Sequence, residues 1–181
     1  MRYLTLTAMA IILSAACPAM AGPSDFEKGP VFKDFGQTAQ VKTDFVIPKR
    51  AKFKVVFDTA DGAKAGEVNK TLNSVARFIN MHAKAGVPEK NLTAAIVFHG
   101  KGSFDLTQTR FYSAKYEGVE NGNAAIIKAL TDNGVRIILC GQTAAYYDIK
   151  NEDLLSGVEM ALSAMTVHAL LQQQGYTLNP F

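Results

Sequence analysis

Four side chains able to take part in chemistry stand at the ends of strands that the sequence predicts. They are Asp58, His99, Cys140 and Ser163, which end or follow the runs 53–58, 93–98, 135–140 and 158–162. In an open sheet of parallel strands, the carboxyl ends share one edge, and ligands bind in the crevice there. A carboxylate, an imidazole, a thiol and a hydroxyl are therefore expected to gather at that edge. Such a set suits nucleophilic chemistry at sulfur, with proton transfer to or from the histidine.

Cys140 is the candidate nucleophile. It ends an apolar strand, and Gly141, Gln142 and Thr143 follow it directly. A helix that begins about two residues later would aim free backbone N–H groups and a positive dipole end at the sulfur, which lowers the pKa of a thiol. The alternative is a small, buried, unreactive side chain, as free cysteines often are. Position alone leaves both interpretations open.

His99 is the candidate partner of Cys140, able to accept or return a proton if the two strands are neighbours. The alternative is a strand-end histidine bonded to a loop carbonyl. Gln142 and Thr143 either orient a small anion or only cap the helix. Asp58 and Ser163 complete the predicted ligand-binding set.

The other two histidines are expected to lie outside the chemistry. His82 falls on the apolar face of a predicted helix, which indicates a core or interface residue, and His168 has no evident partner. The histidines and Cys140 show no C-x-x-C or H-x-x-x-H spacing, so we predict no metal site. No G-x-S-x-G or G-x-G-x-x-G motif is present. The loop 61–66 can offer backbone N–H groups to an anion, which is weak evidence for a nucleotide.

Strands and helices alternate from residue 53 onward. Besides the four strands above, we predict an edge strand over 175–180. Helices are predicted over 67–85, from a cap at 121–123 to Gly134, over 142–147, and from Ser163 or Thr166 to Gln174, with a short helix and a loop within 103–120. Continuous apolar strands separated by helices are typical of a mostly parallel sheet covered on both faces. The fold class is therefore α/β with five strands, in an order that the sequence does not predict.

The first 50 residues differ from the rest. Residues 1–21 have a basic Arg2, an apolar stretch and a small-x-small end, which predicts a secretory signal peptide and a periplasmic or secreted protein. Lipidation of Cys17 is the alternative, disfavoured because Ser14 stands where a lipobox prefers a large aliphatic residue. Residues 22–50 are rich in Gly, Pro and Phe, and predict an extended arm laid on its own domain or on a neighbouring subunit.

The net charge of +3 and the absence of a basic cluster mixed with aromatic residues argue against nucleic-acid binding. The sequence contains no amphipathic basic helix, so we predict no association with a membrane after signal cleavage. Residues 22–181 contain one cysteine, so no internal disulfide can form there. Stability must therefore come from packing, helped by oligomerisation.

Three segments resemble the DsrE/DsrF-like family, and its exported, poorly characterised branch in particular: 135–142, 153–158 and 171–176. The resemblance covers about 52–181 and implies a three-layer α/β/α, flavodoxin-like domain that assembles into trimers or hexamers. Better understood members are cytoplasmic sulfur-transfer proteins whose cysteine carries a persulfide. Cys140 with Thr143 is similar to the start of their motif, whereas Tyr147 and Asp148 stand where a basic residue and glycine are expected.

The resemblance implies an exported protein that handles sulfane sulfur on Cys140, with help from His99 and without an organic cofactor. Its substrate is a persulfide, a polysulfide or thiosulfate. The alternative is a non-catalytic oligomeric module that binds a small ligand or serves a structural role, with Cys140 buried. Accessibility of the thiol distinguishes the two.

Overall fold

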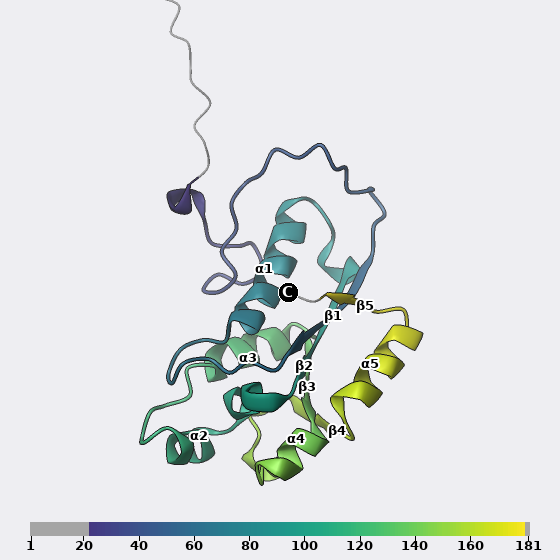
Figure 1. Cartoon of the computed structure of the whole chain (residues 1–181). Helices are drawn as coiled ribbons and strands as arrows, with labels where there is room; N and C mark the ends of the chain where they lie inside the picture. Colours follow the sequence, from purple (N-terminus) through teal and green to yellow (C-terminus); the bar gives the residue numbers. More distant parts are fainter. Residues whose placement is uncertain (1–21, 180–181) are drawn as a thin grey trace, which may run out of the picture.

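The computed structural model describes residues 22–179 and contains one sheet of five parallel strands (Figure 1). The strands are β1 (Phe53–Thr59), β2 (Leu92–Phe98), β3 (Arg136–Cys140), β4 (Val158–Ala161) and β5 (Thr177–Asn179), in the order β4-β3-β2-β1-β5. The predicted α/β class and five-stranded parallel sheet are confirmed, with β5 at an edge. The predicted signal peptide and residue 180 of the predicted fifth strand lie outside the described residues.

Helices cover both faces of the sheet, which gives three layers (Figure 1). They are α1 (Lys70–Lys84), α2 (Thr109–Lys115), α3 (Ala124–Asp132), α4 (Gly141–Tyr146) and α5 (Ala164–Gln173), with short 3-10 helices η1 (Pro23–Asp25), η2 (Glu89–Asn91), η3 (Gly100–Leu106) and η4 (Asn151–Asp153). α1 and α3 pack on one face, and α5 packs on the other. No helix within residues 22–179 is long and apolar enough to cross a bilayer.

Alternation of side chains along the strands decides which face each candidate residue occupies. Val56, Val97 and Ile138 point toward α5 and form a cluster with Val167 and Leu171 of that helix. The residues two positions further along the same strands are Asp58, His99 and Cys140. His99 is itself extended, with φ −147° and ψ −172°. The carboxylate, the imidazole and the thiol therefore share the α5 side of the sheet.

Two helices, α1 and α5, begin at polar caps. Asn69, rather than residue 67, starts α1, because its side-chain oxygen accepts from the N–H of Thr71 at 2.8 Å. Ser163, rather than Thr166, caps α5, because its Oγ accepts from the N–H of Thr166 at 3.1 Å. Such caps satisfy N–H groups that have no partner within the helix.

The amide of Asn80 makes most of the hydrogen bonds that join α1 to the arm preceding β1. Asn80 is fully buried, and its Oδ1 accepts from the N–H groups of Val31 and Phe32 at 3.1 and 2.9 Å. Its Nδ2 lies 3.0 Å from the carbonyl oxygens of Phe32, Phe35 and Gly36. The arm therefore crosses α1 of its own domain at 31–36. It then runs outward over 41–46, where Phe45 is 83% exposed.

The loop after β1 is held by a buried carboxylate. Asp105 is fully buried, and its Oδ2 accepts from the N–H of Ala63 at 2.8 Å and from Asn69 Nδ2 at 2.7 Å. The N–H of Gly66 donates to the hydroxyl of Tyr112. The backbone N–H groups of Ala63 and Gly66, which were predicted to be available to an external anion, therefore donate to other residues of the chain.

We predict that Asp105→Asn reduces the pH dependence of stability. Burial raises the pKa of Asp105 above its ordinary 3.8, and the bonds from Asn69 and Ala63 oppose this only in part. A raised folded pKa means that the contribution to stability is fully present below the unfolded pKa and is lost as pH rises through the folded pKa. Urea unfolding from about pH 4 to about pH 7 measures this loss, which the variant should lack.

Asp132→Asn is the control, since Asp132 is an exposed residue at the end of α3. It should keep the wild-type pH profile. A profile for Asp105→Asn as steep as that of the wild type would contradict the prediction.

Candidate functional site

Several backbone and side-chain donors near the sulfur of Cys140 lower the pKa of its thiol. They come from the backbone N–H groups of Gln142 and Thr143 at the start of α4, from the backbone N–H of Ala164 at the start of α5, and from the Thr143 hydroxyl. The sequence predicted the donors of α4. It did not predict that a second helix start would reach the same atom.

Close approach of β3 and β4 brings the two helix starts together. Cys140 pairs with Ala161 in the parallel ladder, so α4 and α5 begin next to each other. A Cβ on Gly141 would lie 2.3 Å from the carbonyl oxygen of Ala161, far inside contact distance. Only glycine fits there, and its presence lets the chain turn from β3 into α4 against the end of β4.

These donors favour the charged form of Cys140. Burial raises the pKa of the thiol, but the hydrogen bonds together outweigh it and leave the pKa below its ordinary value. Donors at helix starts also place the positive ends of two dipoles at the sulfur. The residue is only 6% exposed, so little of it reaches the surface. The arrangement can stabilise a thiolate, which is the nucleophilic form.

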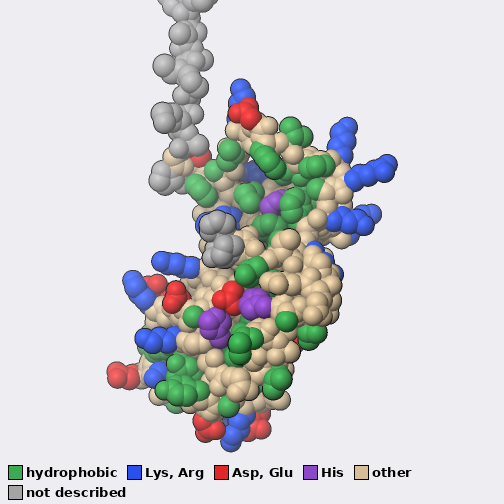
Figure 2. Space-filling model, turned by 45° about the vertical axis from the view of Figure 1, so that its right-hand side comes forward, with side chains coloured by type: hydrophobic (Ala, Val, Ile, Leu, Met, Phe, Trp, Pro, Cys, Tyr) green, Lys and Arg blue, Asp and Glu red, His purple; other side chains and the backbone are tan. Residues whose placement is uncertain are grey.

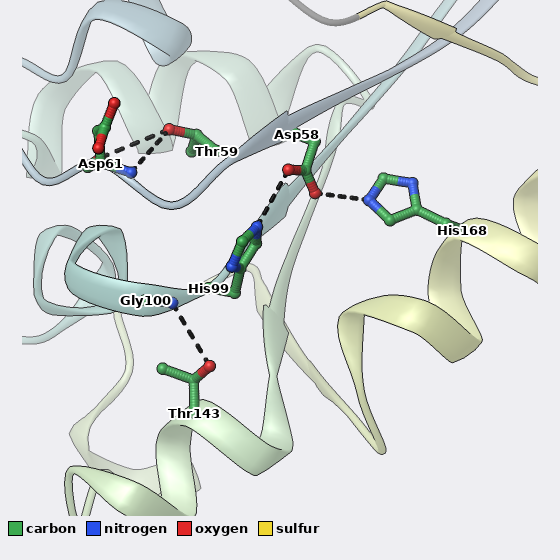
Figure 3. Close-up of polar contacts among 7 residues, drawn as sticks. All are labelled: Asp58, Thr59, Asp61, His99, Gly100, Thr143 and His168. Atoms are coloured by element: carbon green, nitrogen blue, oxygen red, sulfur yellow. Dashed lines mark hydrogen bonds and ion pairs between the residues drawn. The ribbon is translucent and has the colours of Figure 1, made fainter.

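Asp58 lies between two histidines (Figure 3). Its Oδ2 is 3.0 Å from Nε2 of His99, and its Oδ1 is 2.6 Å from Nε2 of His168 on α5. Burial raises the pKa of Asp58, but the hydrogen bonds and charges of the two histidines outweigh it and hold the pKa below its ordinary value. The expectation that His168 lacks a partner was therefore wrong. Its partner is 110 positions away in the sequence, beyond any local pattern.

His99 and Cys140 are neighbours, although the described residues show no hydrogen bond between them. The register pairs Phe98 with Leu139, so the next residues along, His99 and Cys140, end adjacent strands. A second link joins the two segments, because the N–H of Gly100 donates to Thr143 Oγ1 at 3.4 Å (Figure 3). The Thr143 hydroxyl, one of the donors that lower the pKa of Cys140, thus also binds the residue after His99.

The remaining predicted residues lie close by, with their polar groups bonded within the chain. Gln142 is exposed, and its Nε2 donates to the Leu162 carbonyl at 3.2 Å. Ser163 Oγ is used in the cap of α5. Their predicted role in ligand binding stays a prediction. Across 22–179, no group of three or more His, Cys, Asp or Glu side chains has an arrangement that could hold a metal ion.

His82 lies apart from this site, between aromatic rings of the α1 side. Its ring centroid is 4.4 Å from that of Phe53 and 4.2 Å from that of Phe78, and Nδ1 lies 2.7 Å from the Phe78 carbonyl oxygen. These contacts give it a packing role.

Apolar side chains surround the site at the surface. Three of them are between 72% and 82% exposed: Tyr146 at the end of α4, Leu162 just before α5, and Met165 in the first turn of α5. Figure 2 shows two histidines and an acidic side chain together on this side of the molecule, with hydrophobic side chains nearby.

The sequence profile of the DsrE/DsrF-like family matches residues 51–180. Among curated proteins, none matches significantly. Two solved structures share the fold, each at 20% identity and a TM-score of 0.51. MTH1491, a protein of unknown function from Methanobacterium thermoautotrophicum, is matched over 72% of this chain and 100% of its own. The ychN protein from E. coli is matched over 71% and 99%. Because the family match spans most of the chain and the fold agrees, this protein belongs to the DsrE/DsrF-like family.

Proposed function

We propose that this protein accepts and carries sulfane sulfur on Cys140 as a persulfide. The observation that carries the proposal is the group of donors at the sulfur: three backbone N–H groups and the Thr143 hydroxyl. A thiolate held in this way attacks a sulfane sulfur without first losing a proton. Membership of the DsrE/DsrF-like family, in which better understood members carry sulfur on a cysteine, agrees with this role. His99 assists proton transfer, and Gln142 supplies a further hydrogen bond to the bound species.

The protein acts outside the cytoplasm in this proposal, because residues 1–21 have the pattern of a signal peptide. It therefore meets small sulfur species there, and not a cytoplasmic relay. We further propose a homo-oligomer, a trimer or hexamer. Supporting this, Phe45 and Val46 of the arm and Met165 of α5 are each at least 79% exposed, and contacts between subunits would remove their apolar surface from water.

A second function is a non-catalytic binding or structural module. The exposure of Cys140, only 6%, is the observation that favours it, since a buried thiol can serve packing alone. The two functions differ in whether the thiol reacts in the folded protein.

The test is intact mass after incubation with polysulfide, on the full chain carrying Cys17→Ala so that Cys140 is the one thiol. We expect a mass gain of whole sulfur atoms that a reductant reverses, and no gain in the matched Cys140→Ser protein. Iodoacetamide should label the folded protein at neutral pH. A thiol that labels only after unfolding, with no mass gain, would exclude sulfur carriage and leave the binding module.

A further inference from the structure

We propose that Asp58, His99 and His168 form a proton-donating unit, in which His99 protonates the sulfur that leaves when Cys140 attacks its substrate. His99 is the catalytic residue of this unit, and Asp58 and His168 are positioning residues. The proposal rests on the thiol of the proposed function, and it adds the direction of the proton transfer by His99 and the two residues that position it.

The first support is placement. His99 and Cys140 end neighbouring strands at matching positions, about 4.8 Å apart between strand axes. Both residues are on the α5 side of the sheet, where Asp58 meets His168 and the N–H of Ala164 meets the sulfur. The side chain of His99 is 34% exposed. A solvent-exposed imidazole therefore follows the strand next to the one that Cys140 ends.

The second support is the tautomer. Asp58, whose pKa is lowered, is an ionised acceptor, so both histidines present Nε2–H to it. His99 Nδ1 is then the atom left to take up a proton and pass it on. Asp58 fixes the orientation of the ring and stabilises the imidazolium, as a carboxylate does in catalytic triads.

The third support is the asymmetry between the two histidines. Nδ1 of His168 is buried and has no hydrogen-bond partner among the described residues. A proton on that atom would create a buried N–H without an acceptor, which is costly. The hydrogen of His168 is therefore assigned to Nε2, which donates one hydrogen bond, at 2.6 Å, to Asp58 Oδ1. This bond holds the carboxylate so that Oδ2 faces His99.

The chemical step balances without an oxidant or a cofactor. The Cys140 thiolate attacks the outer sulfur of a persulfide R–S–SH, so that a bond from Sγ to sulfur forms and the R–S to S bond breaks. The leaving R–S⁻ takes a proton from His99 Nδ1 and departs as R–SH, and His99 regains a proton from water. A basic leaving thiolate needs this proton, whereas a weakly basic one leaves readily without it.

That difference provides the test. We would measure mixed-disulfide formation by Cys140, in the full chain with Cys17→Ala, using two disulfides. 5,5′-Dithiobis(2-nitrobenzoate) releases a weakly basic aryl thiolate, and oxidised glutathione releases a basic alkyl thiolate. The measured quantity is the rate of reaction with oxidised glutathione divided by the rate with 5,5′-dithiobis(2-nitrobenzoate). His99→Gln should lower this ratio at least about tenfold, because general acids contribute factors of this order and above. His99→Gln should leave the iodoacetamide rate of Cys140 largely unchanged, since iodide needs no proton.

Positioning by His168 is tested by a matched pair of variants. His168→Ala should lower the same ratio, and His168→Gln, whose amide N–H can replace Nε2–H, should restore it in part. His82→Gln, which removes a histidine outside the site, should leave the ratio unchanged. If His99→Gln slows the reaction of Cys140 with both disulfides by the same factor, or slows neither reaction, the proposal is overturned. Disulfide exchange requires a reactive thiol but not sulfur carriage. A labelled thiol without a mass gain from polysulfide therefore excludes the proposed function alone, and an unchanged rate ratio excludes the role of His99 alone.

Discussion

Replacing Ala164 by proline should slow alkylation of Cys140 at neutral pH about tenfold, because a hydrogen bond to a charged group is worth about 1.5–3 kcal/mol. Ala164 is the first residue of α5, and its N–H is one of the donors that lower the pKa of Cys140. Proline is favoured at the first position of a helix, and it lacks the N–H. Ser163 before it is extended, with φ −160° and ψ 160°, as a residue before proline requires. The change therefore removes one donor and keeps the helix.

The measurement is the rate of iodoacetamide labelling against pH. The bond to Ala164 lowers the pKa of Cys140, so its loss should move the labelling curve to higher pH, with the same rate at the alkaline limit. Ala164→Val adds bulk at the same place and retains the N–H, and it should keep the wild-type curve. An unmoved curve for Ala164→Pro would mean that α4 alone stabilises the thiolate.

Asn80→Ala should lower the free energy of unfolding by about 3 kcal/mol, because it leaves several buried backbone groups without partners at about 1–3 kcal/mol each. The amide of Asn80 binds backbone atoms of Val31, Phe32, Phe35 and Gly36. Those groups can recover hydrogen bonds only if the arm leaves α1 for water. Urea unfolding measures the loss of stability, and hydrogen exchange over residues 29–37 should show that the arm is released.

Asn73→Ala is the matched control, because Asn73 accepts a single bond to the arm, from the N–H of Gly36 at 2.8 Å. It should cost about 1 kcal/mol and leave exchange in the arm mostly unchanged. Equal effects of the two variants would contradict a special role for Asn80.

The elements could be predicted from the sequence because their signals are local. The apolar runs around Val56, Val97 and Ile138 and the stop at Gly134 were sufficient to place strands and helices within a few residues. Their order in the sheet depends on pairing between distant segments, such as β1 with β5, and periodicity within a segment carries no information about it.

The site could be predicted only in part, for the same reason. Positions at strand ends placed Asp58, His99 and Cys140 at one edge, and parallel pairing brings them there. The bond between His168 and Asp58, and the bond from Ala164 to Cys140, depend on how α5 packs on the sheet. Asn80 did leave a signal that was missed: an amide on the buried face of α1, beside Ile79, must find polar partners.

The donors at Cys140 have a consequence for how this protein can change over time. Three of the four are main-chain N–H groups, which every amino acid except proline supplies. Substitutions at Gln142 or Ala164 therefore alter side chains without altering the electrostatic surroundings of the sulfur, as long as both helices still begin there. What this site tolerates poorly is an insertion or deletion next to Gly141 or Ser163, since that shifts a helix start away from the sulfur.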